Sequence, residues 1–264
     1  MNPSARSGRI QAVGLTKIFA REDMNATLQA LDNVNLAIEP GEFVSIVGTS
    51  GCGKSTLLRI VAGLEIPTRG EVLCDGKRVN GPDPQRGLVF QEHNLYPWLT
   101  VRGNIEFALK SAKKFKGSQA FVKKLLEVAG LTEFANSYPH QLSGGMRQRA
   151  SLIRALAVAP DVLLLDEPLG ALDSFTRMNL QDEIISLWKE RGSTMILITH
   201  DVDEAIYLSQ RILIMSPRPG RITSELQVPI SYPRNRSSSD FVQLRNVILQ
   251  RLNFARESSE EFNL

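Results

Sequence analysis

Hydrophobic and polar residues alternate along the first part of the chain. Residues 9–37 carry apolar side chains at strand-like spacing, divided by a polar insert at residues 21–27 into two groups: Ile10, Val13, Leu15 and Ile18, then Leu28, Leu31, Val34 and Leu36. Alternation of this kind is typical of strands that bury one face and expose the other. The pattern predicts an antiparallel sheet at this end of the molecule.

Short runs that are almost entirely apolar follow, and they predict strands buried on both faces. Three such runs occupy residues 43–47, 161–165 and 194–198. Helices are predicted at residues 56–62, where Gly63 ends the pattern, and near residues 175–190. Strands and helices that alternate in this order predict an α/β fold with a parallel sheet.

The middle of the chain has helical periodicity. Residues 121–128 and the residues that follow Gly145 repeat apolar positions every three to four residues, so we expect a helical subdomain at about residues 91–160. The main domain is expected to span residues 1–228. Residues 229–264 then form a Pro/Ser-rich link and an amphipathic helix that begins at Ser239, which either packs on its own subunit or binds a partner.

A phosphate-binding loop is predicted directly after the strand at residues 43–47. Its residues have the GxxxxGK[ST] spacing: Gly48, Thr49, Ser50, Gly51, Cys52, Gly53, Lys54, Ser55 and Thr56. Glycines let successive backbone N–H groups face a phosphate, Lys54 adds a positive charge for the β- and γ-phosphates, and the Ser55 hydroxyl can bind Mg²⁺. A glycine-rich turn with a chance lysine is the alternative, but the strand–loop–helix context favours a nucleoside triphosphate site.

Two carboxylates end the second buried run. Asp166 is placed to hold Mg²⁺ through water, and Glu167 could polarise the attacking water as a general base. Pro168 then stops the strand because it lacks a backbone donor. The alternative is a helix N-cap with incidental acidic residues.

A third segment, Leu142-Ser143-Gly144-Gly145, opens a basic helix. A free hydroxyl and bare N–H groups at a helix N-terminus form an anion site, which suits a second phosphate contact. Taken alone, the segment is more typical of an ordinary capped helix start.

In this order the three segments resemble the P-loop, signature and Walker B motifs of ATP-binding-cassette (ABC) proteins, over about residues 9–225. The resemblance implies a P-loop NTPase (RecA-like) core with an antiparallel β-subdomain and an α-helical signature subdomain. It also implies that ATP binds between the P-loop of one subunit and Ser143, Gly144 and Gly145 of a second subunit.

The same resemblance assigns further residues. Gln91 matches the Q-loop glutamine that senses the γ-phosphate through Mg²⁺ and water, and Asp173 matches the D-loop. His200 matches the switch histidine, whose imidazole can both accept and donate a hydrogen bond. Phe19 matches the aromatic residue that stacks on adenine, although tyrosine is more usual there. With Lys54 and Glu167, Gln91 and His200 form the expected catalytic set; Ser55, Gln91 and Asp166 form the Mg²⁺ set.

Composition agrees with a single domain that depends on partners for any membrane role. The 264 residues carry a net charge of +3, too mild to indicate nucleic-acid binding. The N-terminus has no apolar signal region, and no run approaches the length of a membrane helix. The cysteines indicate a reducing compartment: Cys52 is expected to be open to alkylation, and Cys74 to lie in a strand after a turn at Arg69-Gly70.

Two segments refine the resemblance. Residues 94–101, with Leu95, Tyr96, Pro97, Trp98 and Leu99, and residues 216–220 are similar to importers of the nitrate/sulfonate/taurine group. Aliphatic sulfonate or taurine is the first expectation for the solute; nitrate, bicarbonate or a pyrimidine precursor stays open. The resemblance implies a second, identical cassette, a permease that docks near Gln91–Val101, an extracytoplasmic solute-binding protein acting indirectly, and a peripheral position on the cytoplasmic face of the inner membrane.

Two other classes compete with an importer subunit. A soluble ABC ATPase of DNA repair would insert a long coiled coil before the signature, and one of translation would carry two cassettes. A P-loop kinase would lack the signature and His200. The chain has one cassette and no sustained heptads, which favours the importer ATPase.

Overall fold

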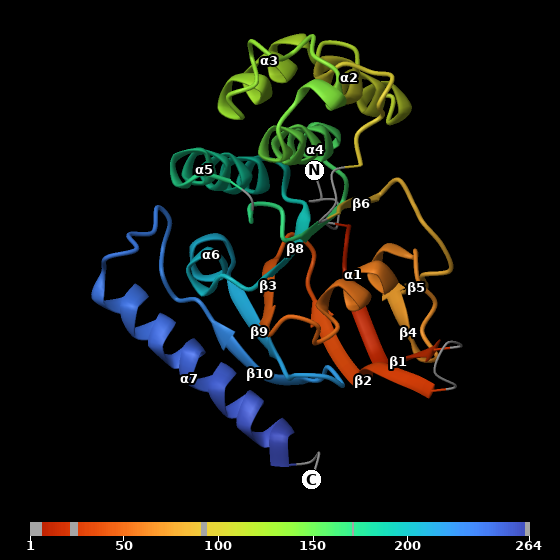
Figure 1. Ribbon diagram of the computed structural model, residues 1–264, viewed down its shortest axis with the longest axis vertical. Helices are drawn as coiled ribbons and strands as arrows, with labels where there is room; N and C mark the ends of the chain where they lie inside the picture. The colour runs from red at the N-terminus through yellow and green to blue at the C-terminus, as the bar shows by residue number, and fades with distance from the viewer. Residues whose placement is uncertain (1–6, 22–25, 91–93, 171, 262–264) are drawn as a thin grey trace, which may run out of the picture. The chain divides into compact units, whose positions relative to one another are not determined.

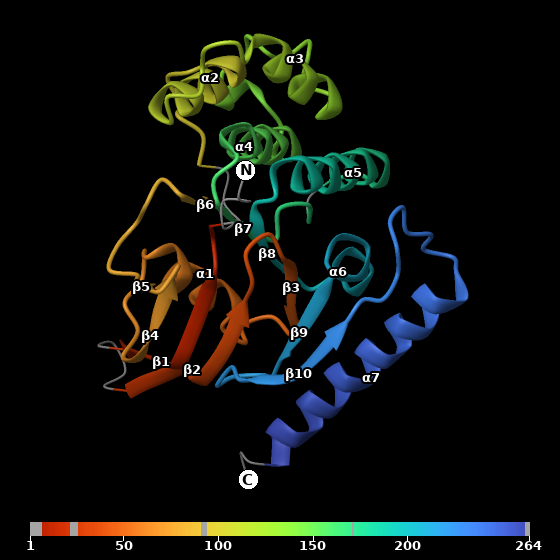
Figure 2. The same ribbon diagram turned by 180° about the vertical axis from the view of Figure 1, so that it is seen from behind.

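The computed structural model describes residues 7–21, 26–90, 94–170 and 172–261, and Figures 1 and 2 show it from opposite sides. The chain divides into two compact units. Unit 1 consists of Met1–Asp83 and Ser193–Leu264, and unit 2 consists of Pro84–Gly192. The P-loop lies in unit 1, whereas the signature and the Walker B carboxylates lie in unit 2.

Three adjacent parallel strands form the centre of unit 1. Strand β3 (Phe43–Gly48) pairs with β8 (Thr194–Thr199) on one side and with β9 (Arg211–Met215) on the other. Strand β10 (Ile222–Gln227) adds to β9 in the antiparallel direction. Every residue of β3 and β8 is buried, which explains why their sequences are almost entirely apolar and confirms the predicted strands.

A second, antiparallel sheet in unit 1 has the order β2-β1-β4-β5 and confirms the predicted β-subdomain. Its strands are β1 (Ile10–Arg21), β2 (Ala26–Ile38), β4 (Arg69–Cys74) and β5 (Lys77–Arg78). The turn expected at Arg69-Gly70 is wrong, because both residues belong to β4. Gly70 has φ +78°, and a Cβ there would lie 2.4 Å from the Val13 carbonyl oxygen, so glycine is required where β4 passes β1.

Helix α1 (Lys54–Ala62) follows the P-loop and confirms the predicted helix, beginning two residues earlier. Its C-cap is Gly63, with φ 79° in the left-handed region that a glycine adopts readily. Helix α6 (Val202–Leu208) follows β8, and its N-terminus is capped by the Asp201 carboxylate, which accepts from the N–H groups of Asp203 (2.9 Å) and Glu204 (3.1 Å).

Helix α7 (Ser239–Glu261) begins at the predicted residue and packs on its own unit. Phe241 and Ile248 are fully buried. The guanidinium of Arg245 pairs with the Asp203 carboxylate of α6, with Nη2 and Oδ2 2.6 Å apart. Of the two roles left open for this helix, these contacts support packing within the subunit.

The Pro/Ser-rich link before α7 is held against the end of α6. Arg234 is 6% exposed, and its guanidinium donates to the carbonyl oxygens of Ser209 (2.6 Å), Tyr207 (3.2 Å) and Ile206. The Tyr232 hydroxyl donates to the Leu208 carbonyl at 2.6 Å. A positive charge at the carbonyl end of a helix is favourable, so the link stabilises α6 from its C-terminal side.

In its described residues, unit 2 contains one strand pair and four α-helices. Strand β6 (Arg86–Val89) pairs in parallel with β7 (Val162–Asp166). The helices are α2 (Val101–Ser111), α3 (Gln119–Val128), α4 (Gly144–Val158) and α5 (Ser174–Arg191), with a 3₁₀ turn at Pro139–Gln141. Helix α4 packs against α2 and α3, and the helices predicted from residues 121–128 and from the signature are confirmed.

Two arginines of α4 hydrogen-bond backbone carbonyls of neighbouring segments in unit 2. Arg149 Nη1 donates to the Ala129 carbonyl and Arg154 Nη1 to the Asn94 carbonyl, each at 2.7 Å. Burial lowers the pKa of the Arg154 guanidinium, whose carbon also lies 5.6 Å from the centre of the Tyr96 ring. The basic face of this helix is therefore partly used in packing unit 2.

The Tyr232 contact makes the stability of the folded chain depend on pH in the alkaline range. Burial raises the pKa of its phenol to about 12, above the value of about 10 for an exposed tyrosine. Because the folded chain holds this proton more tightly, the stabilisation is complete below about pH 10 and is lost as the pH rises towards about 12.

We therefore predict that Tyr232→Phe lowers the free energy of unfolding by about 1 kcal/mol at neutral pH, since a hydrogen bond to a helix-terminal carbonyl is lost. Denaturant unfolding measured across the alkaline range should show the difference from wild type shrinking. Tyr138→Phe, at a more exposed tyrosine, is the control. A difference that stays constant with pH would contradict the prediction.

Candidate functional site

The carboxyl ends of three neighbouring parallel strands bring the candidate residues of unit 1 to one sheet edge. Val47 of β3 lies opposite Thr199 of β8 and Ile214 of β9. The P-loop follows β3, His200 follows β8, and residues 216–221 follow β9 (Figure 1). In parallel α/β sheets this edge is where ligands bind. The fold thus places the P-loop and the exposed His200 next to one another in the sheet order.

The P-loop backbone has the conformation and the close neighbours that a phosphate cradle requires. Gly51 and Gly53 have φ +77° and +104°. A Cβ at Gly53 would lie 2.7 Å from the Ala30 carbonyl oxygen, and one at Gly48 would lie 2.9 Å from Cys52 Sγ. Thr49 and Ser50 are exposed at the tip of the loop. The glycines therefore let the loop fold closely against β2 and on itself.

Helix α1 begins directly after the loop, so its first turn lies at the predicted phosphate site. Within the described residues, no side chain caps its first turn, whose N-cap is Gly53. Ser55 and Thr56 lie half-buried in that turn. The N-terminus of a helix carries a partial positive charge and orphan N–H donors, so this arrangement suits a phosphate.

Lys54 is 5% exposed and turns back onto the loop. Its Nζ donates to the carbonyl oxygens of Gly48 (2.8 Å) and Thr49 (2.9 Å) and lies 3.7 Å from Cys52 Sγ. The ammonium charge is thereby held within the loop. Cys52 is only 1% exposed, so the expectation that its thiol is open to alkylation is wrong: the side chain packs between Gly48 and Lys54.

Phe19 lies on β1 and is half-buried rather than part of the core. Lys17 Nζ stands 4.8 Å from the centre of its ring and 2.6 Å from Glu65 Oε1. A partly exposed ring next to a cation suits stacking on a base, and adenine stacking stays a prediction. Gln91 and Ala171 lie outside the described residues.

In unit 2, β7 delivers the two carboxylates to its carboxyl end. Asp166 is buried as the last residue of the strand, and Glu167 is half-buried with φ +47°. A non-glycine residue in the left-handed region costs about 1–3 kcal/mol unless its surroundings hold it. The amide of Gln148, itself buried, donates from Nε2 to the Glu167 carbonyl oxygen at 3.1 Å. The strained backbone of the candidate base is thus held by the helix that follows the signature.

Gln148 was missed by the sequence reasoning. It lies on α4 one turn before Ser151 and Leu152, which are buried on the same side of the helix. A polar residue on the apolar face of a helix is the pattern that could have found it, because a buried amide needs a partner.

The signature residues begin helix α4. Ser143 is its N-cap, and the Ser143 Oγ accepts from the Met146 N–H at 3.3 Å. The expectation of a free hydroxyl is therefore wrong, because the helix uses this oxygen for its own cap. Gly144 and Gly145 form the first turn. A Cβ at Gly144 would meet no atom of the described residues within 4 Å.

Asp173 is the N-cap of α5 and is exposed. Its Oδ1 accepts from the Thr176 N–H at 2.9 Å, and this backbone hydrogen bond lowers the pKa of the carboxyl. The predicted D-loop aspartate is therefore ionised at neutral pH and ordered by its own helix.

For a metal ion, the candidate donors are the Ser55 hydroxyl in unit 1 and the Asp166 carboxylate in unit 2. The described part of the chain holds no group of three His, Cys, Asp or Glu side chains that could form a cage for a cation. Mg²⁺ in nucleotide sites takes one or two protein ligands and completes its shell with phosphates and water. A hydroxyl and a carboxylate are oxygen donors of the kind that Mg²⁺ prefers.

Residues 31–170 match the family model described as ABC transporter. The chain belongs to the ABC transporter family. It is 49% identical over 236 residues to the aliphatic sulfonates import ATP-binding protein SsuB of Bacillus thuringiensis subsp. konkukian, covering 89% of this chain and 92% of the relative. The protein of the same name from Bacillus anthracis is 50% identical over 236 residues, with the same coverage.

A third relative is an uncharacterized ABC transporter ATP-binding protein of Methanocaldococcus jannaschii, 45% identical over 242 residues, 91% of this chain and 90% of the relative. Among solved structures, the dimeric post-hydrolysis state of the ATP-binding cassette MJ0796 bound to ADP and Pi matches with a TM-score of 0.73 and 37% identity. That match covers 84% of this chain and 100% of the other.

These comparisons confirm the predicted fold class and the predicted ABC importer ATPase, and they do not favour the repair or translation alternative. The chain is an ABC cassette that binds and hydrolyses ATP. Among the helices of the described residues, none is both long enough and apolar enough to cross a membrane.

The Gln148 contact generates a prediction about turnover. Gln148→Met keeps the shape of the side chain but removes the donor that holds the Glu167 carbonyl. We expect a fall in kcat of about fivefold to tenfold, the value of one buried hydrogen bond, with ATP affinity unchanged. Gln119→Met, at the exposed start of α3, is the control. Wild-type kcat in a folded Gln148→Met protein would contradict the prediction.

Proposed function

We propose that this chain energises the import of small organic anions, with aliphatic sulfonates as the solute class, by driving a separate membrane permease. The observation that carries the solute class is the identity of about half of all aligned residues to aliphatic sulfonates import ATP-binding proteins, across nearly the whole chain. The similarity of residues 94–101 and 216–220 to the nitrate/sulfonate/taurine group supports the same assignment.

In this proposal the P-loop binds the triphosphate of ATP. The amides of residues 48–56 and the Lys54 ammonium neutralise the β- and γ-phosphates, and the Phe19 ring stacks on adenine. Ser55 and Asp166 would hold Mg²⁺ together with Gln91, and the ion would supply charge neutralisation at the phosphates. Glu167 takes the proton of the attacking water, and His200 hydrogen-bonds the γ-phosphate.

The proposed ATPase works as a dimer of cassettes. One chain carries one P-loop and one signature segment, and its structural relative is dimeric. Ser143, Gly144 and Gly145 of each chain would contact the γ-phosphate bound by the other, with Asp173 in the adjoining D-loop. The open space around Gly144 supports such an approach. ATP then joins the two chains, and its hydrolysis releases them.

The proposed setting is the cytoplasmic face of the inner membrane, where the chain is peripheral and receives solute indirectly from an extracytoplasmic binding protein. The proposed division of labour gives residues 1–228 to the cassette and 229–264 to a structural extension. Trp98 of unit 2 is 70% exposed and lies beside Tyr96, with ring centres 5.5 Å apart. Exposed aromatic side chains are typical centres of protein interfaces.

The function is tested by Glu167→Gln in the organism that carries this gene. We expect ATPase turnover to fall by about 10²–10⁴-fold, because the general base is lost, while ATP still binds. Uptake of a labelled alkanesulfonate should fall with it, whereas Lys54→Ala should weaken ATP binding itself. Unchanged alkanesulfonate uptake would contradict the proposed solute, and loss of nitrate uptake instead would move the assignment to nitrate.

Permease docking is tested by Trp98→Ala. Tyr96 is half-buried, and its ring lies 5.0 Å from that of Phe107, so a change at Tyr96 would also disturb unit 2. Truncating an interface tryptophan costs about 2 kcal/mol or more, so co-purification with the permease should fall at least about tenfold. ATP affinity of the isolated chain should stay normal. Phe134→Ala, another exposed aromatic residue of unit 2, is the control. Normal permease association of Trp98→Ala would refute the docking site.

A further inference from the structure

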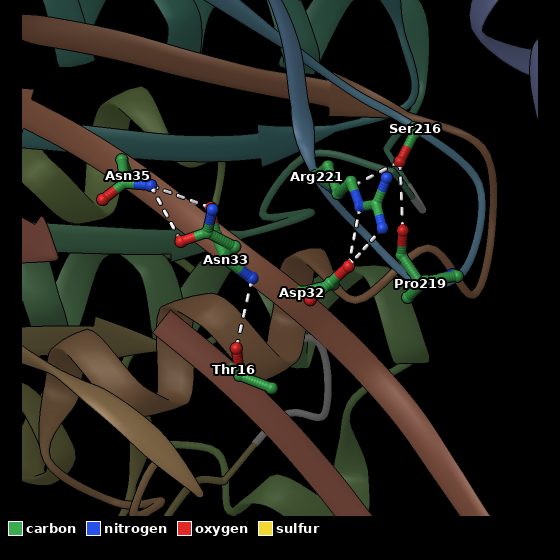
Figure 3. Close-up of polar contacts among 7 residues, drawn as sticks. All are labelled: Thr16, Asp32, Asn33, Asn35, Ser216, Pro219 and Arg221. Atoms are coloured by element: carbon green, nitrogen blue, oxygen red, sulfur yellow. Dashed lines mark hydrogen bonds and ion pairs between the residues drawn. The ribbon is translucent and has the colours of Figure 1, made fainter. Parts of the chain in front are cut away.

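The segment between β9 and β10 forms a closed, well-anchored loop, which we call the proline loop: Ser216, Pro217, Arg218, Pro219, Gly220 and Arg221. The Ser216 hydroxyl accepts from the Arg221 N–H at 3.0 Å and donates to the Pro219 carbonyl at 3.1 Å. Figure 3 shows these two contacts closing the loop. One buried hydroxyl thereby fixes both ends of the turn.

The proline loop is also joined to β2. The Gly220 N–H donates to the Ala30 carbonyl at 2.9 Å, and the Asp32 N–H donates to the Gly220 carbonyl at 3.0 Å. The Arg221 guanidinium pairs with the Asp32 carboxylate, with Nε and Oδ2 2.8 Å apart (Figure 3). The two backbone hydrogen bonds hold the loop in one place on unit 1, whereas the exposed ion pair adds little, because surface charges attract one another only weakly in water.

From this position the proline loop touches the P-loop backbone. A Cβ at Gly220 would lie 2.1 Å from the Cys52 carbonyl oxygen, so only glycine allows this approach. The Arg218 side chain reaches the neighbouring peptide: its Nε and Nη2 donate to the Gly51 carbonyl oxygen at 3.1 and 2.8 Å. Two donors from one planar guanidinium on one oxygen fix the direction of that carbonyl.

The direction of the Gly51 carbonyl determines where the next amide points. The Gly51–Cys52 peptide is planar and trans, so its N–H points opposite to its carbonyl. In this structure the Cys52 N–H is directed to the Thr49 carbonyl, within the loop, at a long 3.4 Å. Arg218 binds this peptide on its carbonyl side, so the N–H is directed into the loop, where successive backbone N–H groups can bind a phosphate.

We propose that Arg218 is a positioning residue for nucleotide binding, which holds the Gly51–Cys52 peptide of the P-loop in its phosphate-binding orientation from outside the cradle. Its guanidinium acts through the Gly51 carbonyl and does not contact the phosphates. The proposal rests on the P-loop as the nucleotide site and is independent of the solute or the permease. Arg218 then acts on the ATP site from a segment that lies 167 positions away from Gly51 in the sequence.

The test compares Arg218→Ala with Arg221→Ala, a loss of an exposed arginine from the same loop that pairs with Asp32 instead of the P-loop. For Arg218→Ala we expect the Kd and KM for Mg-ATP to rise about five- to tenfold, with kcat at saturating ATP within about twofold of wild type. Arg221→Ala should keep the wild-type Kd even if its melting temperature falls. Arg218→Lys, which retains one charged donor, should restore part of the affinity.

Amide exchange gives a readout of the peptide itself. In nucleotide-free protein, hydrogen–deuterium exchange over residues 49–53 should be faster in Arg218→Ala than in wild type and unchanged in Arg221→Ala. An unchanged Kd for Arg218→Ala, or an equal loss of affinity in both variants, would overturn the proposal. A fall in kcat without a rise in KM would also overturn it. Each result is obtained on the purified protein without a permease. Failure of the importer assignment would therefore leave the proposed role of Arg218 intact.

Discussion

The parallel pairing of β3 with β8 and β9 is the constraint on which the rest of unit 1 depends. Parallel strands in register present their carboxyl ends at one edge, so the P-loop, His200 and the proline loop emerge side by side. Both β3 and β8 are fully buried, and exposing their apolar residues to water would be unfavourable, so these strands stay at the centre of the unit. The position of the predicted phosphate cradle is therefore a consequence of how the sheet packs, and its glycines allow the backbone to fold closely there.

A second recurring feature is the binding of backbone carbonyls by lysine and arginine side chains. Lys54 binds two carbonyls of its own loop, Arg218 binds Gly51, and Arg234 closes the end of α6. A buried carbonyl oxygen without a backbone partner needs another hydrogen-bond donor. A guanidinium supplies several such donors in one plane. In unit 2, Gln148 has the equivalent function at the strained Glu167 backbone. The contacts of Lys54, Arg218 and Gln148 hold backbone next to a proposed catalytic or phosphate-binding group.

The sequence predictions failed for side chains whose exposure and hydrogen bonds depend on how neighbouring residues pack. Cys52 was expected to be reactive, but it is packed between Gly48 and Lys54. The Ser143 hydroxyl was expected to be free, but the first turn of α4 uses it as a cap. Tyr96 and Trp98 belong to the same short run of apolar residues. Tyr96 is half-buried because its ring packs on Phe107, whereas the Trp98 ring is exposed.

The sequence by itself determined the order of the motifs, the buried strands and the helices that follow them, because apolar periodicity and glycine spacing are local properties of the chain. The ATPase class also followed from that order, since the three motifs seldom occur together by chance. Only the tertiary structure decided that Arg218 contacts Gly51, a residue 167 positions away. Such a contact depends on strand order and register, which bring remote segments together. No local sequence pattern predicts it.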